Sequence, residues 1–237
     1  MTVAFLDLDG TLSRGSHTIR FPRALADLGL INPTIADDIE ALAAAYAAGA
    51  MRWTPYATAV DVAYGRAIRG MRAEEFQGAG RAYAASPTAQ LSYYDHALPL
   101  VAAVRESGRT AILTTGSPSE IVAPLALFLG VDAFHATELE IIDGRYTGVI
   151  AHDGGGRDAK RAVAERYRSE GHDLSCAAGF GDTASDLGFL NLVQHPVAVK
   201  PNDELLPHAQ QRGFAICSTA DEVLAVARAL PRIQKAS

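Results

Sequence analysis

The sequence contains only two cysteines, Cys176 and Cys217, which lie forty-one residues apart. Neither belongs to a Cys-x-x-Cys pair or to a Cys/His group with the spacing of a metal site, so the sequence excludes a structural zinc site or a dithiol redox centre. We expect both residues to be free thiols.

Long apolar stretches and an excess of basic residues are also missing. No segment free of Asp, Glu, Lys and Arg exceeds thirteen residues, whereas a membrane-spanning helix needs about twenty apolar residues. The N-terminus has no basic region and reaches a carboxylate at Asp7, unlike a signal peptide. The 27 acidic residues outnumber the 21 basic ones, which disfavours nucleic acid and anionic lipid as partners. We therefore expect a cytoplasmic protein.

The 237 residues, 49% of them hydrophobic, are enough to form a sizeable core. Short apolar runs without alternation are typical of strands that are buried on both faces, and helical patterns separate most of them. The apolar runs are Val3–Leu6, Thr110–Thr114, Val131–His135, Ser175–Ala178, Pro196–Val199 and Phe214–Cys217. The helical patterns span about 97–107, 118–129, 158–170, 183–192, 203–212 and 220–229. This alternation predicts an α/β fold with a parallel sheet.

Two segments depart from the alternation. Residues 139–149 contain Asp143-Gly144 between two strand-like arms, which predicts an antiparallel hairpin with a tight turn. Residues from about 20 to 92 show almost only helical pattern, with helices expected over 34–48, 55–69 and 72–85. We therefore predict an α/β core of residues 1–15 and 93–237, interrupted by a helical segment of residues 16–92.

Two acidic residues, Asp7 and Asp9, follow the first predicted strand in the sequence Asp-Leu-Asp-Gly-Thr. Residues i and i+2 of an extended segment point the same way, and two close carboxylates need a cation such as Mg²⁺ to neutralise them. An Asp-Gly hairpin turn is the simpler alternative. Four fixed residues in this pattern arise by chance in a chain of this length with a probability on the order of 10⁻³.

Three further groups follow later strands. Asp182 and Asp186 lie one helical turn apart after a glycine-rich approach, although Asp182 alone could be a simple N-cap. Lys160 falls in the first turn of a predicted helix, where a cation opposes the helix dipole, although a solvated lysine is the common case. Thr114–Pro118 leads from a strand into a helix and offers an anion site, although it also fits ordinary helix initiation.

Ligands of parallel sheets bind at the carboxyl ends of the strands, and all four groups fall there. Together they supply paired acids, a further acid, a lysine and a hydroxyl, which is a set suited to phosphoryl transfer. The order and spacing resemble the haloacid dehalogenase superfamily of phosphotransferases, in its phosphoserine-phosphatase-like branch. The first family motif matches Asp7–Thr11, the second Thr115, the third Lys160, and the fourth Gly181-Asp182 with Asp186.

The resemblance implies a Rossmann-like parallel core with an inserted helical cap of the C1 type, and an aspartyl-phosphate mechanism. Asp7 would be the nucleophile and Asp9 the general acid and base. Mg²⁺ would be held by Asp7, the Asp9 carbonyl and Asp182, with Asp186 supporting the metal or the lysine. The substrate, a small-molecule phosphate ester, would be bound by Thr115, Gly116, Lys160 and Arg14. A retained second aspartate favours phosphate chemistry over dehalogenation.

The substrate motifs depart from those of phosphoserine phosphatases. Position 10 is glycine where that branch usually has serine, and residues 13–20 contain no acidic residue to bind an amine. Arg14 and His17 at the entrance of the predicted cap could select an anionic or planar leaving group together with cap residues. Those cap residues are Arg52, Trp53, Tyr56 and Arg66. Solvated arginines and packed aromatic residues are the alternative.

Three activities fit these motifs. The first is a Mg²⁺-dependent phosphomonoesterase acting on a small metabolite such as histidinol phosphate or another alcohol phosphate. The second is a phosphotransferase or mutase that uses the same phospho-aspartate. The third is a non-catalytic protein that binds a phosphorylated ligand, which the intact first and fourth motifs disfavour.

Overall fold

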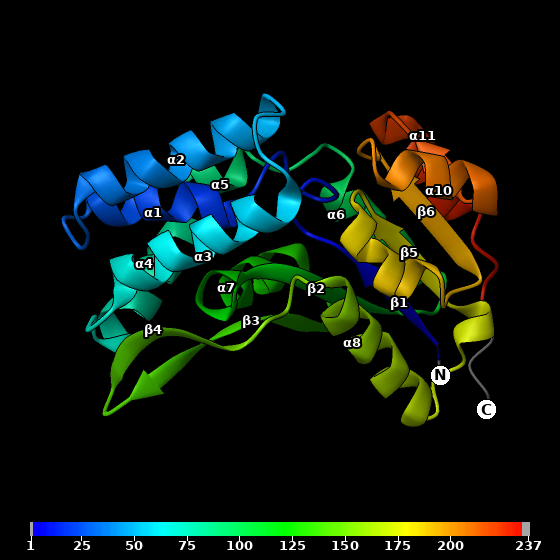
Figure 1. The fold of residues 1–237 in the computed structure, drawn as a ribbon. Coiled ribbons are helices and arrows are strands. Elements are labelled where there is room, and N and C mark those ends of the chain that lie inside the picture. Colours follow the sequence, from blue (N-terminus) through cyan, green and yellow to red (C-terminus); the bar gives the residue numbers. More distant parts are fainter. Residues whose placement is uncertain (1, 234–237) are drawn as a thin grey trace.

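The computed structural model describes residues 2–233, except for the side chains of Trp53 and Thr54. One sheet runs through this part of the chain in the order β4-β3-β2-β1-β5-β6-β7 (Figure 1). Its strands are β1 (Val3–Leu6), β2 (Thr110–Pro118), β3 (Ala133–Ile142), β4 (Arg145–His152), β5 (Ala178–Gly181), β6 (His195–Val199) and β7 (Ala215–Cys217). Neighbouring strands pair in parallel except β3 and β4, so the predicted α/β fold is confirmed.

Helices that follow the strands cover both faces of this sheet. They are α6 (Ala97–Glu106), α7 (Ser119–Leu129), α8 (Arg157–Ser169), α9 (Leu187–Leu190), α10 (Leu205–Arg212) and α11 (Ala220–Arg228). The side chains of β1 alternate between the two faces: Leu6 packs in the same cluster as α6, α7 and α11, and Phe5 packs in the cluster of α8, α9 and α10. Because both faces are covered at the centre of the sheet, the residues of β1 and β5 are buried throughout.

Of the six helices that the structure describes between β1 and β2, the first five cluster on one side of the molecule, coloured blue to green in Figure 1. They are α1 (His17–Asp27), α2 (Pro33–Ala47), α3 (Trp53–Ile68), α4 (Ala73–Ala84) and α5 (Pro87–Gln90). The three helices expected from the sequence correspond to α2, α3 and α4. Helix α1 was not expected as a separate helix; Pro22 inside it obscured its helical pattern.

The β3–β4 hairpin anchors this helical segment to the sheet. The predicted turn is confirmed, because Asp143 (φ 49°) and Gly144 (φ 72°) both have the positive φ of a type I′ turn. Helix α3 lies so close to β4 that a Cβ on Gly65 would come within 2.3 Å of the Gly148 carbonyl oxygen. The Tyr146 ring packs on Phe76 of α4 with 4.8 Å between centroids. The hairpin therefore fixes where the helices sit above the strand ends.

Two predicted elements differ from the structure, the first in position and the second in type. The strand expected at 175–178 begins three residues later than predicted, at Ala178 of β5. A 3₁₀ turn, Leu174–Cys176, occupies the start of the predicted strand. Glycine is unfavourable in a strand, so the glycines of β5 did not indicate one. At Gly181 close packing requires glycine, because a Cβ there would come within 2.4 Å of the Asp186 Cβ. The helix expected over 183–192 is a 3₁₀ turn, Ala184–Asp186, joined to the single turn of α9. The later start of β5 puts Asp182 directly at its end.

Candidate active site

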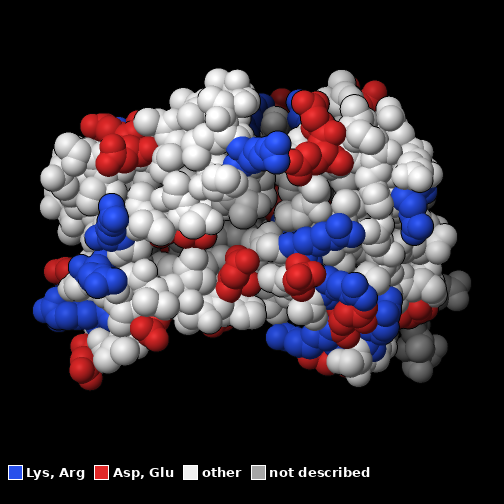
Figure 2. Space-filling model, viewed as in Figure 1, with Lys and Arg blue, Asp and Glu red and all other residues white. Residues whose placement is uncertain are grey.

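A cavity of about 400 Å³ lies between the carboxyl ends of the strands and the helices α1–α3. Figure 2 shows this side of the molecule hollowed between the helical segment and the sheet core, with charged side chains of both signs around the rim. Seven of the eight site residues predicted from the sequence belong to this region: Asp7, Asp9, Thr115, Gly116, Lys160 and Asp182 line the cavity, and Asp186 lies directly behind them.

Asp7 is the first residue after β1 and is 4% exposed. Its backbone N–H donates to the Phe180 carbonyl of β5 at 2.9 Å, which continues the pairing between the two strands beyond their ends. Oδ1 accepts a 2.6 Å hydrogen bond from the Lys160 ammonium. Oδ2 is buried and has no hydrogen-bond partner. One oxygen of Asp7 is therefore held, and the other is left open at the cavity.

Lys160 lies in the first turn of α8 and is only 3% exposed, so it is not a solvated surface lysine. Its ammonium bonds Asp7 Oδ1 and Asp186 Oδ1, both at 2.6 Å. Burial alone would lower the pKa of Lys160, but the charges of Asp186 and Asp7 outweigh it and raise this pKa. The lysine is therefore charged, and it links the ends of β1 and β5 to α8.

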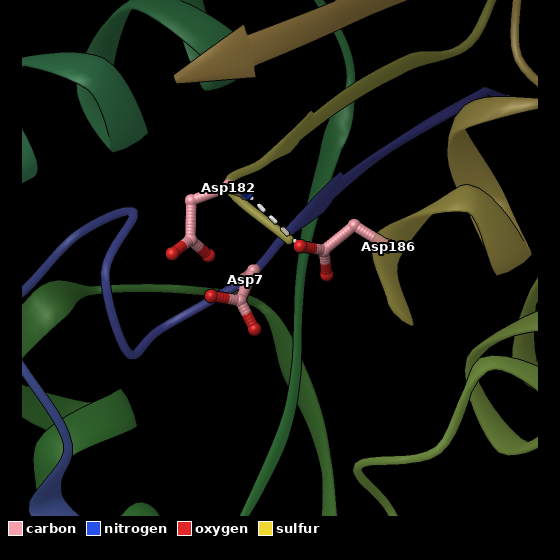
Figure 3. Close-up of side chains that lie close together, drawn as sticks. All are labelled: Asp7, Asp182 and Asp186. Atoms are coloured by element: carbon pink, nitrogen blue, oxygen red, sulfur yellow. Dashed lines mark hydrogen bonds between the residues drawn. The ribbon is translucent and has the colours of Figure 1, made fainter. Parts of the chain in front are cut away.

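Asp186 has both carboxylate oxygens engaged. Oδ1 binds Lys160, and Oδ2 accepts the backbone N–H groups of Asp182 and Thr183 at 2.9 Å each. Figure 3 shows this carboxylate reaching the end of β5 from the following turn, with the bond to the Asp182 backbone dashed. Thr183 is the N-cap of this turn and Asp186 completes its capping box, so the simple N-cap interpretation of Asp182 is wrong.

The carboxylates of Asp7 and Asp182 lie side by side at the strand ends in Figure 3. With Asp186 they offer oxygens that all lie within 4.8 Å of one another. Asp182 accepts one hydrogen bond, from the Thr11 hydroxyl at 3.2 Å. Gly10 lets the loop come this close: its φ is +93°, and a Cβ there would lie 2.0 Å from Asp182 Oδ2.

These close carboxylates have pKa values above their ordinary range. Burial raises the pKa of Asp7 to about 7, with Asp186 contributing in the same direction and Lys160 opposing. Burial, followed by the charges of Asp7 and Asp186, raises the pKa of Asp182 well above its usual value. A single ammonium does not balance three buried carboxylates, so the donor set fits a hard divalent cation. Asp7 and Asp182 have the capacity to bind it, since the Asp186 oxygens are already engaged.

Asp9 is partly buried on the other side of the loop and points toward α1 and β2. Its Oδ1 accepts the backbone N–H of His17, the first residue of α1, at 2.9 Å, and its Oδ2 accepts the Ser117 hydroxyl at 2.6 Å. The Ser117 hydroxyl is also 2.9 Å from that of Thr18, and either of the two can donate. Asp9 is thus oriented by a hydroxyl pair that its sequence motif did not reveal.

Thr115 and Gly116 form the end of β2 beside the cavity. Thr115 is fully buried, and its hydroxyl accepts the Ser117 N–H at 3.1 Å. Gly116 faces Gly155 so closely that a Cβ on Gly116 would come within 3.0 Å of the Gly155 Cα. Two glycines therefore let the β2 end and the loop before α8 meet around the cavity.

Arg14 is the one predicted site residue that neither lines the cavity nor contacts a side chain that does so at the strand ends. It is exposed; its guanidinium donates to the Tyr93 carbonyl and lies 4.9 Å from the Tyr94 ring centroid. His17 is fully buried against Tyr83. Of the other entrance and cap residues considered, Tyr56 lines the cavity, whereas Arg52 and Arg66 are exposed outside it. The side chain of Trp53 lies outside the described residues.

Several cavity residues were not predicted from the sequence. Tyr46, Asp61 and Asp153 line it, and Ser117 holds Asp9. The position of Asp153 before three glycines is the only signal that could have indicated one of them, because such a loop suits a close approach. The others lie on helices or in a strand end with no pattern of their own.

Within residues 2–233, none of the helices has both the length and the apolar composition that crossing a membrane requires. Both cysteines are free thiols, as expected: Cys217 is buried and Cys176 partly so.

Comparisons with known proteins agree with this geometry. A probable phosphatase of Mycobacterium tuberculosis is 30% identical over 227 residues, covering 92% of this chain and 75% of the relative. A crystal structure of a Bordetella pertussis protein of unknown function matches with a TM-score of 0.74 at 25% identity, covering 92% of this chain and 99% of that one. A phospho-aspartyl intermediate analogue of phosphoserine phosphatase shares the fold with a TM-score of 0.65 at 16% identity, covering 94% and 97%.

The model of the haloacid dehalogenase-like hydrolase family matches residues 4–191, a range that contains every predicted site residue from Asp7 to Asp186. It extends from β1 through the helical segment and β2 to α9, so it includes both the strand ends and the helices above them. The chain belongs to the haloacid dehalogenase-like hydrolases and shares the fold of phosphoserine phosphatase.

Proposed function

We propose that the protein is a Mg²⁺-dependent phosphomonoesterase that hydrolyses a small phosphorylated metabolite through an aspartyl-phosphate on Asp7. The observation that carries the proposal is the environment of Asp7: Lys160 holds Oδ1, while Oδ2 is buried, unpartnered and beside the cavity. A carboxylate held in this way is oriented as a nucleophile, because its free oxygen has a fixed direction.

The proposed cation site consists of Asp7, Asp182 and the backbone carbonyl of Asp9. The raised pKa values of Asp7 and Asp182 support it, since a bound cation would relieve their mutual repulsion. When bound, Mg²⁺ would neutralise the negative charges that a carboxylate and a phosphate ester bring together.

In the first step Asp7 Oδ2 attacks phosphorus and forms a P–O bond, while the bond from phosphorus to the ester oxygen breaks. Protonated Asp9 gives its proton to the departing alkoxide, which leaves as a neutral alcohol. Ser117 keeps the Asp9 carboxyl in place, and because either hydroxyl of the Ser117–Thr18 pair can donate, Ser117 can bond Asp9 in both protonation states.

In the second step water attacks the phosphorus of phospho-Asp7. Asp9, now a carboxylate, takes the water proton, and the bond from phosphorus to Asp7 breaks to release inorganic phosphate. Both aspartates then return to their starting states. Lys160, Thr115 and Gly116 would bind the transferring oxygens, and Asp186 keeps Lys160 and the backbone of Asp182 in position.

The proposed division of labour follows the predicted domains. Residues 1–15 and 93–237 form the catalytic core, and residues 16–92 form the cap. Support comes from the cavity lining, in which Ile19, Tyr46 and Tyr56 of the helical segment face the acidic strand ends. In this proposal the residues at the strand ends catalyse the reaction, and the helices form the wall of the cavity that contacts the leaving group.

The test is hydrolysis of p-nitrophenyl phosphate and a metabolite panel, with Mg²⁺ and with EDTA. We expect activity that EDTA abolishes and added Mg²⁺ restores. Asp7→Asn should remove the activity and keep the fold, whereas Asp38→Asn, an exposed acid on α2 outside this cavity, should match the wild type. Activity that survives EDTA or Asp7→Asn contradicts the proposal. A product ratio that responds to an added acceptor alcohol would assign the phosphotransferase activity instead.

A further inference from the structure

The cavity consists of a floor, which the proposed chemistry uses, and an upper wall, which it does not use. Its floor is formed by the acidic strand ends, where the buried Oδ2 of Asp7 has no partner. Its upper wall comes from the helical segment and the loop before α8. The residues of this upper wall include Ile19, Tyr46, Tyr56, Val60, Asp61, Ile150 and Asp153. A phosphate ester seated with its phosphorus at Asp7 would direct its leaving group toward this wall.

Aromatic and aliphatic side chains make up most of the upper wall. The rings of Tyr46 and Tyr56 stack on each other with 4.5 Å between centroids and 8° between planes. Tyr56 and Val60, one turn apart on α3, are both buried, at 9% and 5% exposure. The wall is therefore rigid, and its aromatic faces favour a planar group or a cation.

Two carboxylates complete the upper wall. Asp61 lies on α3, and Asp153 lies in the loop before α8, where its oxygens accept the N–H groups of Gly155 and Gly156. Among the described residues, Asp61 has no hydrogen-bond or ion-pair partner. Both side chains are exposed to solvent while they line the cavity. Partial desolvation, followed by the charge of Asp153, raises the pKa of Asp61, so the two acids repel each other weakly. A cation between them would remove this repulsion.

Cations are scarce in the described lining of the cavity. Lys160 is the only lysine or arginine there, and it is already paired with Asp7 and Asp186. Basic side chains visible near the rim in Figure 2 are not part of that lining. A substrate carboxylate would therefore meet Asp61 and Asp153 without a cation to bind it.

We infer that the leaving group is a cationic alcohol, with an ammonium or imidazolium group placed near Asp61 and Asp153 against the Tyr56 ring, and that a carboxylate on it is rejected. This inference rests on the proposed function, because it assumes that the phosphoryl group binds at Asp7. It distinguishes the chain from an enzyme for phosphoserine, although its fold is shared with phosphoserine phosphatase.

The experiment compares substrate pairs that differ by one carboxylate. Phosphoethanolamine is paired with phosphoserine, and phosphotyramine is paired with phosphotyrosine. Histidinol phosphate is tested as a larger substrate with a cationic leaving group, and glycerol phosphate as one with a neutral leaving group. The reference substrate is p-nitrophenyl phosphate. We expect kcat/KM to be roughly three- to tenfold higher for the ester without the carboxylate in each pair, because the charges of Asp61 and Asp153 are exposed and partly screened by solvent.

Asp61→Asn tests the charge directly. It should lower the ratio of kcat/KM for phosphoethanolamine over phosphoserine roughly two- to threefold, as expected for the loss of one of two solvent-exposed charges. Tyr56→Leu keeps an apolar wall and should weaken the aromatic and cationic esters. Asp38→Asn removes an equal charge from the exposed side of α2 and should leave the ratio unchanged.

The outcomes separate the two proposals. If p-nitrophenyl phosphate and every metabolite fail, the proposed function is wrong. If p-nitrophenyl phosphate is hydrolysed but phosphoserine or phosphotyrosine is turned over as well as its partner, the function stands and the inference is overturned. An unchanged ratio in Asp61→Asn also overturns it, because the selectivity would then come from another part of the wall.

Discussion

Replacing Lys160 by methionine removes the buried ammonium that lies between Asp7 and Asp186 and keeps a side chain of similar length. The wild-type lysine makes two 2.6 Å charged hydrogen bonds at 3% exposure. Without it, the Oδ1 atoms of these two buried carboxylates lose their hydrogen-bond partner. Removing one member of a buried ion pair costs about 3–5 kcal/mol, and in a chain of this size each kcal/mol lowers Tm by about 2–4 °C.

The expected result is a fall in Tm of roughly 6–20 °C, obtained from those two ranges, when thermal unfolding is followed by circular dichroism in EDTA. The matched control is Arg161→Met, at the next position of α8, where the side chain is exposed and its ion pair with Glu165 spans 3.9 Å. Such a pair contributes at most about 1 kcal/mol. A Lys160→Met protein that unfolds within 2 °C of the control would refute the claim that this lysine holds the site together.

Three further predictions concern other parts of the site. Ser117→Ala should lower kcat about tenfold with little change in KM, because Asp9 loses its 2.6 Å hydrogen bond, and Ser117→Thr should restore it in steady-state assays. Gly65→Ala should lower Tm measurably, since the new Cβ would lie 2.3 Å from the Gly148 carbonyl oxygen. Millimolar Mg²⁺ should raise the wild-type Tm in a thermal shift assay, and Asp182→Asn should abolish that increase.

Most of the core could be predicted from the sequence because its signals are local. Three of the six apolar runs match β1, β6 and β7 to within one residue, and two overlap β2 and β3 but end four and seven residues before those strands end. Asp143-Gly144 forms the predicted turn. Asp7, Asp182 and Lys160 came together as expected, because each follows a strand end or begins a helix that leads away from one. A parallel sheet collects such positions at one edge.

The remainder depended on contacts between distant segments. The β5 strand was placed three residues early, since Gly181 is unfavourable for a strand unless packing such as that with Asp186 requires it. Ser117 lies in the predicted anion site Thr114–Pro118, but its contact with Asp9 arises from how β2 meets α1. Asp61 belongs to no motif and reaches the cavity because α3 crosses it. Arg14 has a charge suited to a phosphate ester, but its side chain turns to the Tyr93 carbonyl.

The central claim is that Asp7 takes up the phosphoryl group of the substrate. The most direct measurement is a rapid acid quench of the enzyme during turnover of a ³²P-labelled ester in Mg²⁺, followed by peptide mapping of the protein-bound label. We expect transient labelling of the N-terminal peptide at Asp7, lost in hydroxylamine and absent in Asp7→Asn. Turnover without labelled protein, or with the label on another residue, would contradict the account.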